Sequence, residues 1–201
     1  MKEIPDKSVD LILTDPPYGI LPKGKLQDRF NWDNIDLIPF TEKWFGESFR
    51  KLKDNRFLFT FWSQKYLKEG FRIFNPDRMI FWRYDNLINV SSGDFAYDYE
   101  PIFVIKKGNA KLVTGKHSCD LHFTKPQSNF RKDKLVHPTQ KPIGLLENLI
   151  RIASKKNDII LDPFMGSGTT IVACKKLERN YIGIDNSLKY YRITEERLRT
   201  I

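Results

Sequence analysis

The sequence predicts an α/β protein built on a doubly wound, mostly parallel sheet. Short apolar runs alternate with amphipathic segments along the chain, and a glycine-containing loop, 163–170, links one apolar run to the helical segment after it. The chain has 201 residues, of which 40 % are apolar and 13 % aromatic, enough to bury one sizeable core. We therefore predict a single domain over residues 1–201.

Six apolar runs and five amphipathic segments give the predicted elements in chain order. The first run is rich in Val, Leu and Ile and is stopped by Pro16 and Pro17, because proline fixes φ and has no N–H. The predicted strands are 9–13, 56–61, 78–83, 101–106, 158–162 and 180–185. The predicted helices are 37–52, 64–74, 143–153, about 170–177 and 187–199, the last with Ser187 as N-cap. The predicted loops are 19–34 and 84–99.

Composition narrows the functional classes. A net charge of +9 and a pI of about 9.4 favour a polyanionic partner, most often nucleic acid, although simple solubility would give the same charge. The two cysteines, Cys119 and Cys174, are far apart in sequence, so no disulfide framework is indicated and a reducing cytoplasm is expected. No apolar run approaches the ~18–20 residues of a membrane span, and the N-terminus lacks the apolar core of a signal peptide.

The segment 107–136 differs in character from the rest of the chain. Eight lysines and arginines and two aspartates between 106 and 136 give a net charge of +6, about two-thirds of the total. Clustered basic residues with interleaved Phe, Asn and Gln suit a surface that holds a phosphate backbone and contacts base edges, whereas the alternative is a solvated charged loop. The candidate DNA-binding residues are Lys107, Lys111, Lys116, Lys125, Arg131, Lys132 and Lys134.

The same segment contains three residue types that metals bind. His117, Cys119 and His122 stand close together, but no matching pair of ligands occurs elsewhere in the sequence. No metal site is therefore predicted.

The first candidate site follows the first strand. Asp15, the carbonyl of Pro16 and the ring of Tyr18 come together at the carboxyl end of that strand, which is the edge where open α/β sheets bind ligands. Two acceptors beside a flat ring suit a planar group that carries an NH2. The alternative is an ordinary strand-to-loop turn with an exposed tyrosine.

The second candidate site is the glycine-containing loop. Gly166 and Gly168 allow close approach of the backbone to a ligand, and the helix after them offers unpaired N–H groups. The loop has no Gly-Lys-Ser/Thr, and Ile171 stands where G-x-G-x-x-G needs its third glycine. Asp185 ends the next strand about 20 residues on, where an acidic side chain can accept ribose hydroxyls, and Asp162 adds a second carboxylate. Carboxylates in place of a pyrophosphate site indicate a cationic nucleoside, S-adenosylmethionine. The alternative is a turn needed only for tight helix–strand packing.

Three motifs in this order, 15–18 (DPPY), 137–142 (HPTQKP) and 162–170 (DPFMGSGTT), resemble the β group of DNA amino-methyltransferases. The strand 100–108 is also similar to the one before that group's target-recognition segment. In the β group the catalytic half precedes the cofactor-binding half, as it does here. The resemblance, which covers nearly the whole chain outside 107–136, implies a Rossmann-like methyltransferase fold in circularly permuted order, with 107–136 as a short recognition insertion.

The resemblance also implies residue roles. Asp15 and the Pro16 carbonyl would accept hydrogen bonds from the target amine, Tyr18 would stack on a flipped base, and Thr139 and Lys141 would help hold the methionine carboxylate. The implied catalytic residues are Asp15, Pro16, Pro17 and Tyr18. The implied cofactor-binding residues are Thr139, Lys141, Asp162, Pro163, Phe164, Gly166, Gly168, Thr169, Thr170 and Asp185.

The implied reaction is methylation of double-stranded DNA with S-adenosylmethionine and without a metal. Asp at position 15 favours N6 of adenine; N4 of cytosine is the nearest alternative, and a DNA-binding relative without catalysis is another. Relatives that act on RNA commonly carry Asn here, so RNA ranks below DNA. A homodimer and a cognate restriction endonuclease stay open as partners of a cytoplasmic protein encoded by a bacterium, an archaeon or a phage.

The N-terminus departs from the family pattern. Relatives usually carry, upstream of the first motif, a Gly-Asp turn and a strand that lie against the cofactor's adenine, and residues 1–8 contain neither. We therefore expect six strands rather than seven and a partly open cofactor site. Either the given sequence starts after those elements, or another residue such as Ile4 or Pro5 closes the adenine side.

Overall fold

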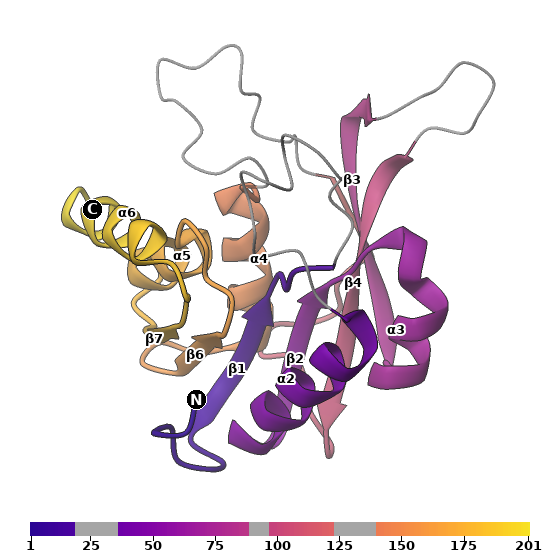
Figure 1. Cartoon of the computed structure of the whole chain (residues 1–201), viewed down its shortest axis with the longest axis horizontal. Helices are drawn as coiled ribbons and strands as arrows, with labels where there is room; N and C mark the ends of the chain where they lie inside the picture. Colours follow the sequence, from indigo (N-terminus) through magenta and orange to yellow (C-terminus); the bar gives the residue numbers. More distant parts are fainter. Residues whose placement is uncertain (19–35, 89–96, 123–139) are drawn as a thin grey trace.

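The computed structural model describes residues 1–18, 36–88, 97–122 and 140–201, which form one sheet with helices on both faces (Figure 1). The strands are β1 (Val9–Thr14), β2 (Leu52–Phe61), β3 (Arg78–Ile88), β4 (Tyr97–Lys107), β5 (Asp120–His122), β6 (Ile159–Asp162) and β7 (Asn180–Gly183). The helices are α2 (Leu37–Lys51), a 3-10 turn (Gln64–Tyr66), α3 (Leu67–Phe74), α4 (Ile143–Ala153), α5 (Thr169–Lys176) and α6 (Leu188–Arg199).

The sheet has seven strands in the order β5-β3-β4-β2-β1-β6-β7. Strand β1 pairs in parallel with β2 and β6, and β6 with β7, whereas β4 is antiparallel to both of its neighbours. The predicted doubly wound, mostly parallel sheet is confirmed. Because β4 alone of these strands runs backwards, its first residues lie at the edge where the other six strands end (Figure 1).

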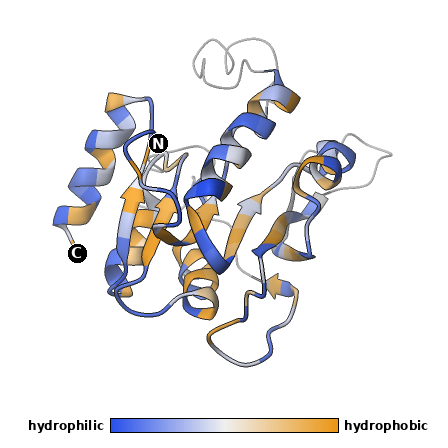
Figure 2. Cartoon of the chain, turned by 90° about the horizontal axis from the view of Figure 1, so that it is seen from below, coloured by the Kyte–Doolittle hydropathy of each residue, from blue (hydrophilic) through white to orange (hydrophobic). Residues whose placement is uncertain are grey.

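Two apolar clusters hold the layers together. Helices α2 and α3 cover one face of the sheet, where Trp44 and Phe74 pack with Leu58 and Phe103. Helices α4 and α5 cover the other face, with Leu145 and its neighbours on β1 and β2, and α6 packs against α5. In Figure 2 the central strands are largely apolar, whereas the helices alternate between apolar and polar residues. This alternation is the amphipathic pattern that predicted them.

The prediction of six strands is wrong for the sheet that the described residues form. The additional strand, β5, lies within the segment 107–136 and pairs in parallel with β3. A three-residue strand with one apolar member carries no alternation signal, and it forms because β3 otherwise has a free edge: the backbone N–H of Phe81 donates to the carbonyl of Cys119 at 2.7 Å.

The predicted loop 84–99 is also wrong at both ends. Strand β3 continues to Ile88 and β4 begins at Tyr97, so the two form a longer antiparallel hairpin. Main-chain pairing extends the strands beyond their apolar runs. The predicted helix 64–74 is a 3-10 turn followed by α3, and Leu52 opens β2 instead of closing α2. The predicted loop 19–34 lies outside the described residues.

The N-terminal residues lie at the amino edge of the sheet. The backbone N–H groups of Lys7 and Ser8 donate to the carbonyls of Arg50 and Lys51 at the end of α2. Ile4 is buried in the same apolar cluster as Trp44. The expectation that Ile4 or Pro5 closes a cofactor pocket is therefore wrong, because the glycine loop lies beyond the opposite ends of the strands. Of the helices described, none combines the length and apolar character that a bilayer crossing requires.

Candidate active site

The two candidate sites meet at one edge of the sheet. Strands β1 and β6 are neighbours, with Leu11 opposite Ile160 and Ile12 opposite Leu161. At their ends the buried hydroxyl of Thr14 donates to Oδ1 of Asp162 at 2.9 Å. Since Thr14 precedes Asp15 and Asp162 opens the glycine loop, the fold brings the two motifs together at this edge.

Both carboxylate oxygens of Asp15 have partners. Oδ2 lies 2.6 Å from Nζ of Lys141, and Oδ1 accepts a hydrogen bond from the Tyr18 hydroxyl. The same ammonium lies 2.9 Å from Oε1 of Glu100 on β4. Burial by itself would lower the pKa of Lys141, but attraction by Asp15 and Glu100 outweighs it, so this pKa stands above its ordinary value. The lysine is therefore a cation at neutral pH.

The Tyr18 ring rests on a buried aromatic wall. Its centroid lies 5.4 Å from that of Trp62, edge to face at 79°. The Trp62 indole N–H donates to the carbonyl of Tyr66 at 2.7 Å, which fixes the indole. A Cβ on Gly70 of α3 would come within 2.4 Å of both Trp62 and Phe103. Helix α3 thus needs glycine at this position to make room for the wall that supports Tyr18.

The glycine loop between β6 and α5 is held by hydrogen bonds that its backbone N–H groups donate to neighbouring residues. Gly166 and Gly168 have φ of +50° and +76°, the left-handed region that glycine tolerates. The N–H of Met165 donates to the carbonyl of Ile184 at 2.9 Å, and the N–H of Phe164 donates to Asp162 at 3.1 Å. The Phe164 ring packs on α2, 5.6 Å from the centroid of Trp44. The loop is a preformed cradle at the start of α5.

Helix α6 braces this loop through two residues that sequence reasoning missed. The Arg197 guanidinium donates to the carbonyl of Ser167 and, at 3.2 Å, to the hydroxyl of Thr169. The Thr194 hydroxyl lies 3.4 Å from the carbonyl of Gly166. Thr194 and Arg197 are three residues apart and so lie on one face of α6. The sequence does not show that this face contacts the glycine loop, because that contact depends on how α6 packs against α5.

Asp185 organises the loop as well. Its carboxylate accepts from the N–H of Gly166 at 3.0 Å and from the N–H of Ser187 at 2.7 Å. Burial raises its pKa, against the effect of these two hydrogen bonds. Ser187 does occupy the N-cap position of α6, but its side chain makes no capping bond, so the predicted cap is wrong in its chemistry. Asp185, two residues earlier, instead fixes the backbone just before the helix through the Ser187 N–H.

Asp162 is a buried carboxyl with a perturbed affinity for protons. Burial raises its pKa to about 6, and nearby Asp15 adds to the rise, whereas hydrogen bonds from Thr170, Phe164 and Thr14 lower it. Its ordinary value is 3.8. Asp162 is therefore still largely protonated in mildly acidic solution, at pH values where an ordinary aspartate has lost its proton.

Protonation of Asp162 should be visible in the stability of the protein. Between about pH 4 and pH 6 the folded protein still holds the Asp162 proton, whereas the unfolded chain has lost it. Proton binding by Asp162 therefore stabilises the folded state fully below about pH 4, and this contribution is lost as the pH rises through about 6. The total change in unfolding free energy is on the order of 3 kcal/mol. Urea denaturation across this range should show a fall in unfolding free energy that Asp162→Asn removes. An identical slope in both proteins would contradict the assignment.

The first residues of the basic segment 107–136 lie away from Asp15 and the glycine loop. The Lys107 ammonium donates to the carbonyls of Phe49 at 2.8 Å and Leu52 at 2.6 Å, where it caps the C-terminus of α2 at the amino edge. Lys111 stands between Asn109, bonded to Asn55, and Val113, bonded to Ile152 at the end of α4. The Lys107 ammonium is therefore engaged by the end of α2, and the backbone on either side of Lys111 is bonded at the amino edge, away from Asp15. DNA binding by these two lysines stays a prediction.

The remaining predicted residues are placed as follows. Lys116 lies in an exposed turn before β5. Pro16 is buried and Pro17 half-buried beside Asp15, and Pro163 lies buried between Asp162 and Phe164. Five predicted residues lie outside the described part of the chain: Lys125, Arg131, Lys132, Lys134 and Thr139.

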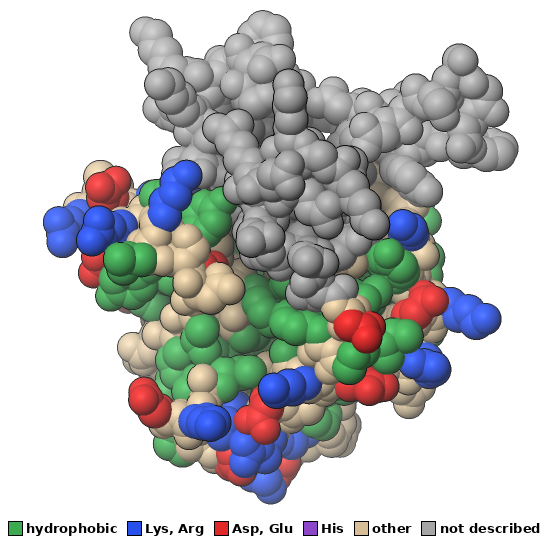
Figure 3. All heavy atoms as spheres, viewed as in Figure 1, with side chains coloured by type: hydrophobic (Ala, Val, Ile, Leu, Met, Phe, Trp, Pro, Cys, Tyr) green, Lys and Arg blue, Asp and Glu red, His purple; other side chains and the backbone are tan. Residues whose placement is uncertain are grey.

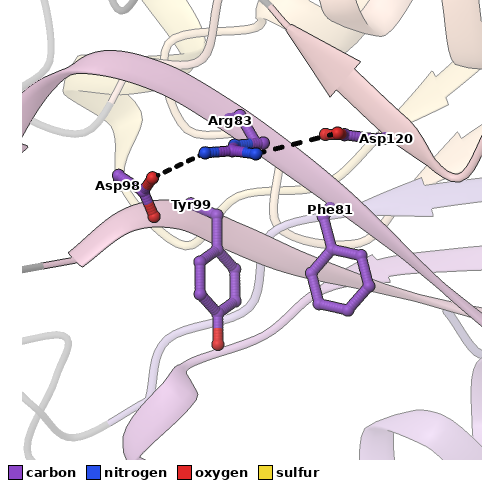
Figure 4. Close-up of a pocket in the computed structure, with 5 residues that line it drawn as sticks. All are labelled: Phe81, Arg83, Asp98, Tyr99 and Asp120. Atoms are coloured by element: carbon purple, nitrogen blue, oxygen red, sulfur yellow. Dashed lines mark hydrogen bonds and ion pairs between the residues drawn. The ribbon is translucent and has the colours of Figure 1, made fainter.

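A separate open pocket of about 360 Å³ lies on β3, β4 and β5. Figure 4 shows the Arg83 guanidinium between Asp98, at 2.9 Å, and Asp120, at 3.9 Å, above the Phe81 and Tyr99 rings. None of the predicted catalytic residues lines it. Side chains alternate along a strand, so Tyr99 points here while Glu100 next to it reaches Lys141.

The sheet edge that carries Asp15 beside the glycine loop is the arrangement that the sequence resemblance predicts for an α/β methyltransferase. The comparisons agree. A family model described as DNA methylase matches residues 9–196, and the chain belongs to this family of DNA amino-methyltransferases. The "Type II methyltransferase M2.MboI" of Moraxella bovis is 33% identical over 233 residues, covering 100% of this chain and 84% of that protein.

Solved structures give the same result. The "M1.HpyAVI-SAM complex" matches with a TM-score of 0.69 at 28% identity and covers 95% of this chain and 89% of that one. The "PvuII DNA methyltransferase (cytosine-N4-specific)" shares the fold, with a TM-score of 0.67 at 18% identity over 98% of this chain and 87% of that one. S-Adenosylmethionine is confirmed as the cofactor of the family, and the predicted methyltransferase fold is confirmed.

Proposed function

We propose that this protein transfers a methyl group from S-adenosylmethionine to N6 of adenine at specific sites in double-stranded DNA. The observation that carries the proposal is the bond between Thr14 and Asp162, which puts the Asp15 carboxylate and the glycine loop on adjacent strand ends. An amine held by Asp15 would then face a ligand held by the loop.

The residues of the loop suit S-adenosylmethionine. Gly168 would clash with Thr194 if it had a Cβ, so α6 packs directly on the backbone of the loop and holds its shape. Asp162 and Asp185 are carboxylates, which fit a cationic nucleoside better than a phosphate. When bound, the cofactor supplies an electrophilic methyl carbon. Gly166 and Gly168 would hold it by close backbone contact, Asp185 would accept from its ribose, and Phe164 would contact it from the α2 side.

The amine site supplies the remaining chemistry. The lone pair of an aromatic NH2 is delocalised into its ring, so the amine is a poor nucleophile. Asp15 and the Pro16 carbonyl, aimed at its two hydrogens, favour a more tetrahedral nitrogen, which is electrostatic preorganisation. After methyl transfer the amine nitrogen would have one proton to lose, and Asp15 would be the adjacent acceptor for it. Tyr18 would hold the flipped base by stacking.

DNA contacts are assigned to the later part of the basic segment. Strand β5 ends with His122 opposite Arg83, at the edge of the sheet where Asp15 lies, and residues 123–136 follow directly. We accordingly treat 1–201 as one catalytic domain in which 107–122 belongs to the sheet and its amino edge. The recognition role is then left to Lys125, Arg131, Lys132 and Lys134.

Salt dependence of DNA binding separates the two parts of the segment. The logarithm of the binding constant should fall steeply with the logarithm of salt concentration, and Lys132→Ala should reduce the slope by about 1 because one phosphate contact is lost. Lys111→Ala, the matched control at the amino edge, should leave the slope unchanged. Equal effects of the two substitutions, or a flat response of the unaltered protein, would contradict this division.

The experiment that tests the function is incubation with duplex DNA and methyl-labelled cofactor, followed by nucleoside analysis. Label in N6-methyladenine is the expected result. Label in N4-methylcytosine would refute the choice of base while retaining the chemistry, and the absence of label from all nucleosides would refute methyl transfer to DNA.

A further inference from the structure

Three residues from distant parts of the sequence converge at the reaction edge. Lys141 precedes α4, Glu100 begins the inner part of β4, and Asp15 follows β1. Nζ of Lys141 lies 2.6 Å from Asp15 and 2.9 Å from Glu100, and its side chain is only 10% exposed. Two of the three N–H bonds of the ammonium are thus used by carboxylates.

The Lys141 ammonium also lies over two aromatic rings. It lies 4.8 Å from the centre of the Phe61 ring, at the end of β2, and 6.0 Å from that of Trp82 on β3. Strand β2 runs between β1 and β4. Lys141 therefore spans the end of β2 and ties the start of β4 to the end of β1. A cation clamped by two carboxylates above an aromatic face has little rotational freedom.

We infer that Glu100 and Lys141 form a positioning pair for Asp15. Glu100 holds the ammonium, and the ammonium holds Oδ2, so that Oδ1 is presented to the target amine. In the free protein Oδ1 accepts from the Tyr18 hydroxyl, the donor that the amine would replace. This inference rests on the proposed function, which makes Asp15 the amine acceptor. It gives Lys141 a role different from holding the methionine carboxylate, because two of its three N–H donors are already engaged by carboxylates of this chain.

Glu100→Gln is the decisive variant, since it removes one charge, keeps the shape and leaves Lys141 paired with Asp15. The single-turnover rate of methyl transfer, at saturating cofactor and DNA, should fall about 10- to 100-fold, as expected for a displaced reacting group. The dissociation constants of S-adenosylmethionine and DNA should stay within about twofold. Glu178→Gln is the matched control, because Glu178 pairs with exposed Lys156 at 2.7 Å, far from this edge, and should leave the rate unchanged.

Lys141→Met tests whether Glu100 acts on Asp15 through Lys141. If Glu100 acts only through Lys141, the double variant should be no slower than Lys141→Met alone. Should Lys141→Met fail to fold, Glu100→Gln still decides the matter.

Two results would overturn the inference. In one, Glu100→Gln is silent while Lys141→Met weakens S-adenosylmethionine binding about tenfold or more, which would return Lys141 to the cofactor. In the other, Glu100→Gln lowers the melting temperature and weakens both ligands together, which would indicate a purely structural role. Failure of the proposed function looks different: the unaltered protein would not methylate DNA, or Asp15→Ala would keep full turnover.

Discussion

Replacing Asp15 with alanine is expected to slow methyl transfer by at least about 10³-fold while S-adenosylmethionine binds with affinity within about twofold of the unaltered protein. The carboxylate acts on the amine in the transition state, so its loss should appear in the rate of the chemical step. The glycine loop keeps its contacts, because Asp162 and Asp185 hold it independently of Asp15.

Single-turnover kinetics and calorimetry measure these two quantities separately. Asp15→Asn refines the test, since it keeps the shape and removes the charge that Lys141 faces. Asp54→Ala, which removes an exposed carboxylate 2.7 Å from Lys7, is the matched control and should alter neither quantity. Parallel loss of turnover and cofactor affinity in Asp15→Ala would mean that the amine site is misassigned.

Gly168→Ala should have the second large effect, a loss of at least about tenfold in cofactor affinity together with a lower melting temperature. Gly168 has a φ of +76°, and an added Cβ would lie 2.3 Å from Cγ2 of Thr194. Left-handed backbone costs a residue with a Cβ roughly 1–2 kcal/mol, and overpacking typically adds about 1–3 kcal/mol. The loop must shift or α6 must move away from it, and either change disturbs the cradle.

The control for this substitution is Gly46→Ala in α2. No atom lies within 4 Å of the added Cβ there, so the change should be neutral or stabilise the helix by up to about 1 kcal/mol. Thr194→Ala should rescue part of the loss in Gly168→Ala, because it removes the nearest atoms. Calorimetry and thermal unfolding of the four proteins check the prediction; an unaffected Gly168→Ala would show that the loop tolerates a Cβ.

The sequence predicted the parts of the site that depend on local signals. An apolar run closed by a carboxylate and two prolines does end at the edge of the sheet, beside the strand that carries Asp162. The glycines at 166 and 168 do have positive φ. These features follow from residue types within a few positions of one another, so one sequence suffices to locate them.

The features that escaped prediction depend on contacts between distant segments. Lys107 stands in a basic stretch, and only the return of β4 beside α2 turns its ammonium to the helix carbonyls. Lys141 lies in the family motif, yet its pairing with Glu100 requires knowing that β4 runs antiparallel. Strand β5 has too little apolar character to be recognised before its neighbour is known.

Figure 3 shows acidic and basic side chains mixed over the described surface of one face, with no continuous basic patch among them. The described chain leaves for residues 123–139 at the end of β5 and comes back just before Lys141, both at the reaction edge. Because both ends lie at one edge, exchange of residues 123–136 for a relative's stretch of another length should leave the strand order unchanged. Such chimaeras would test whether the recognised DNA sequence can be changed while the catalytic part of the chain stays the same.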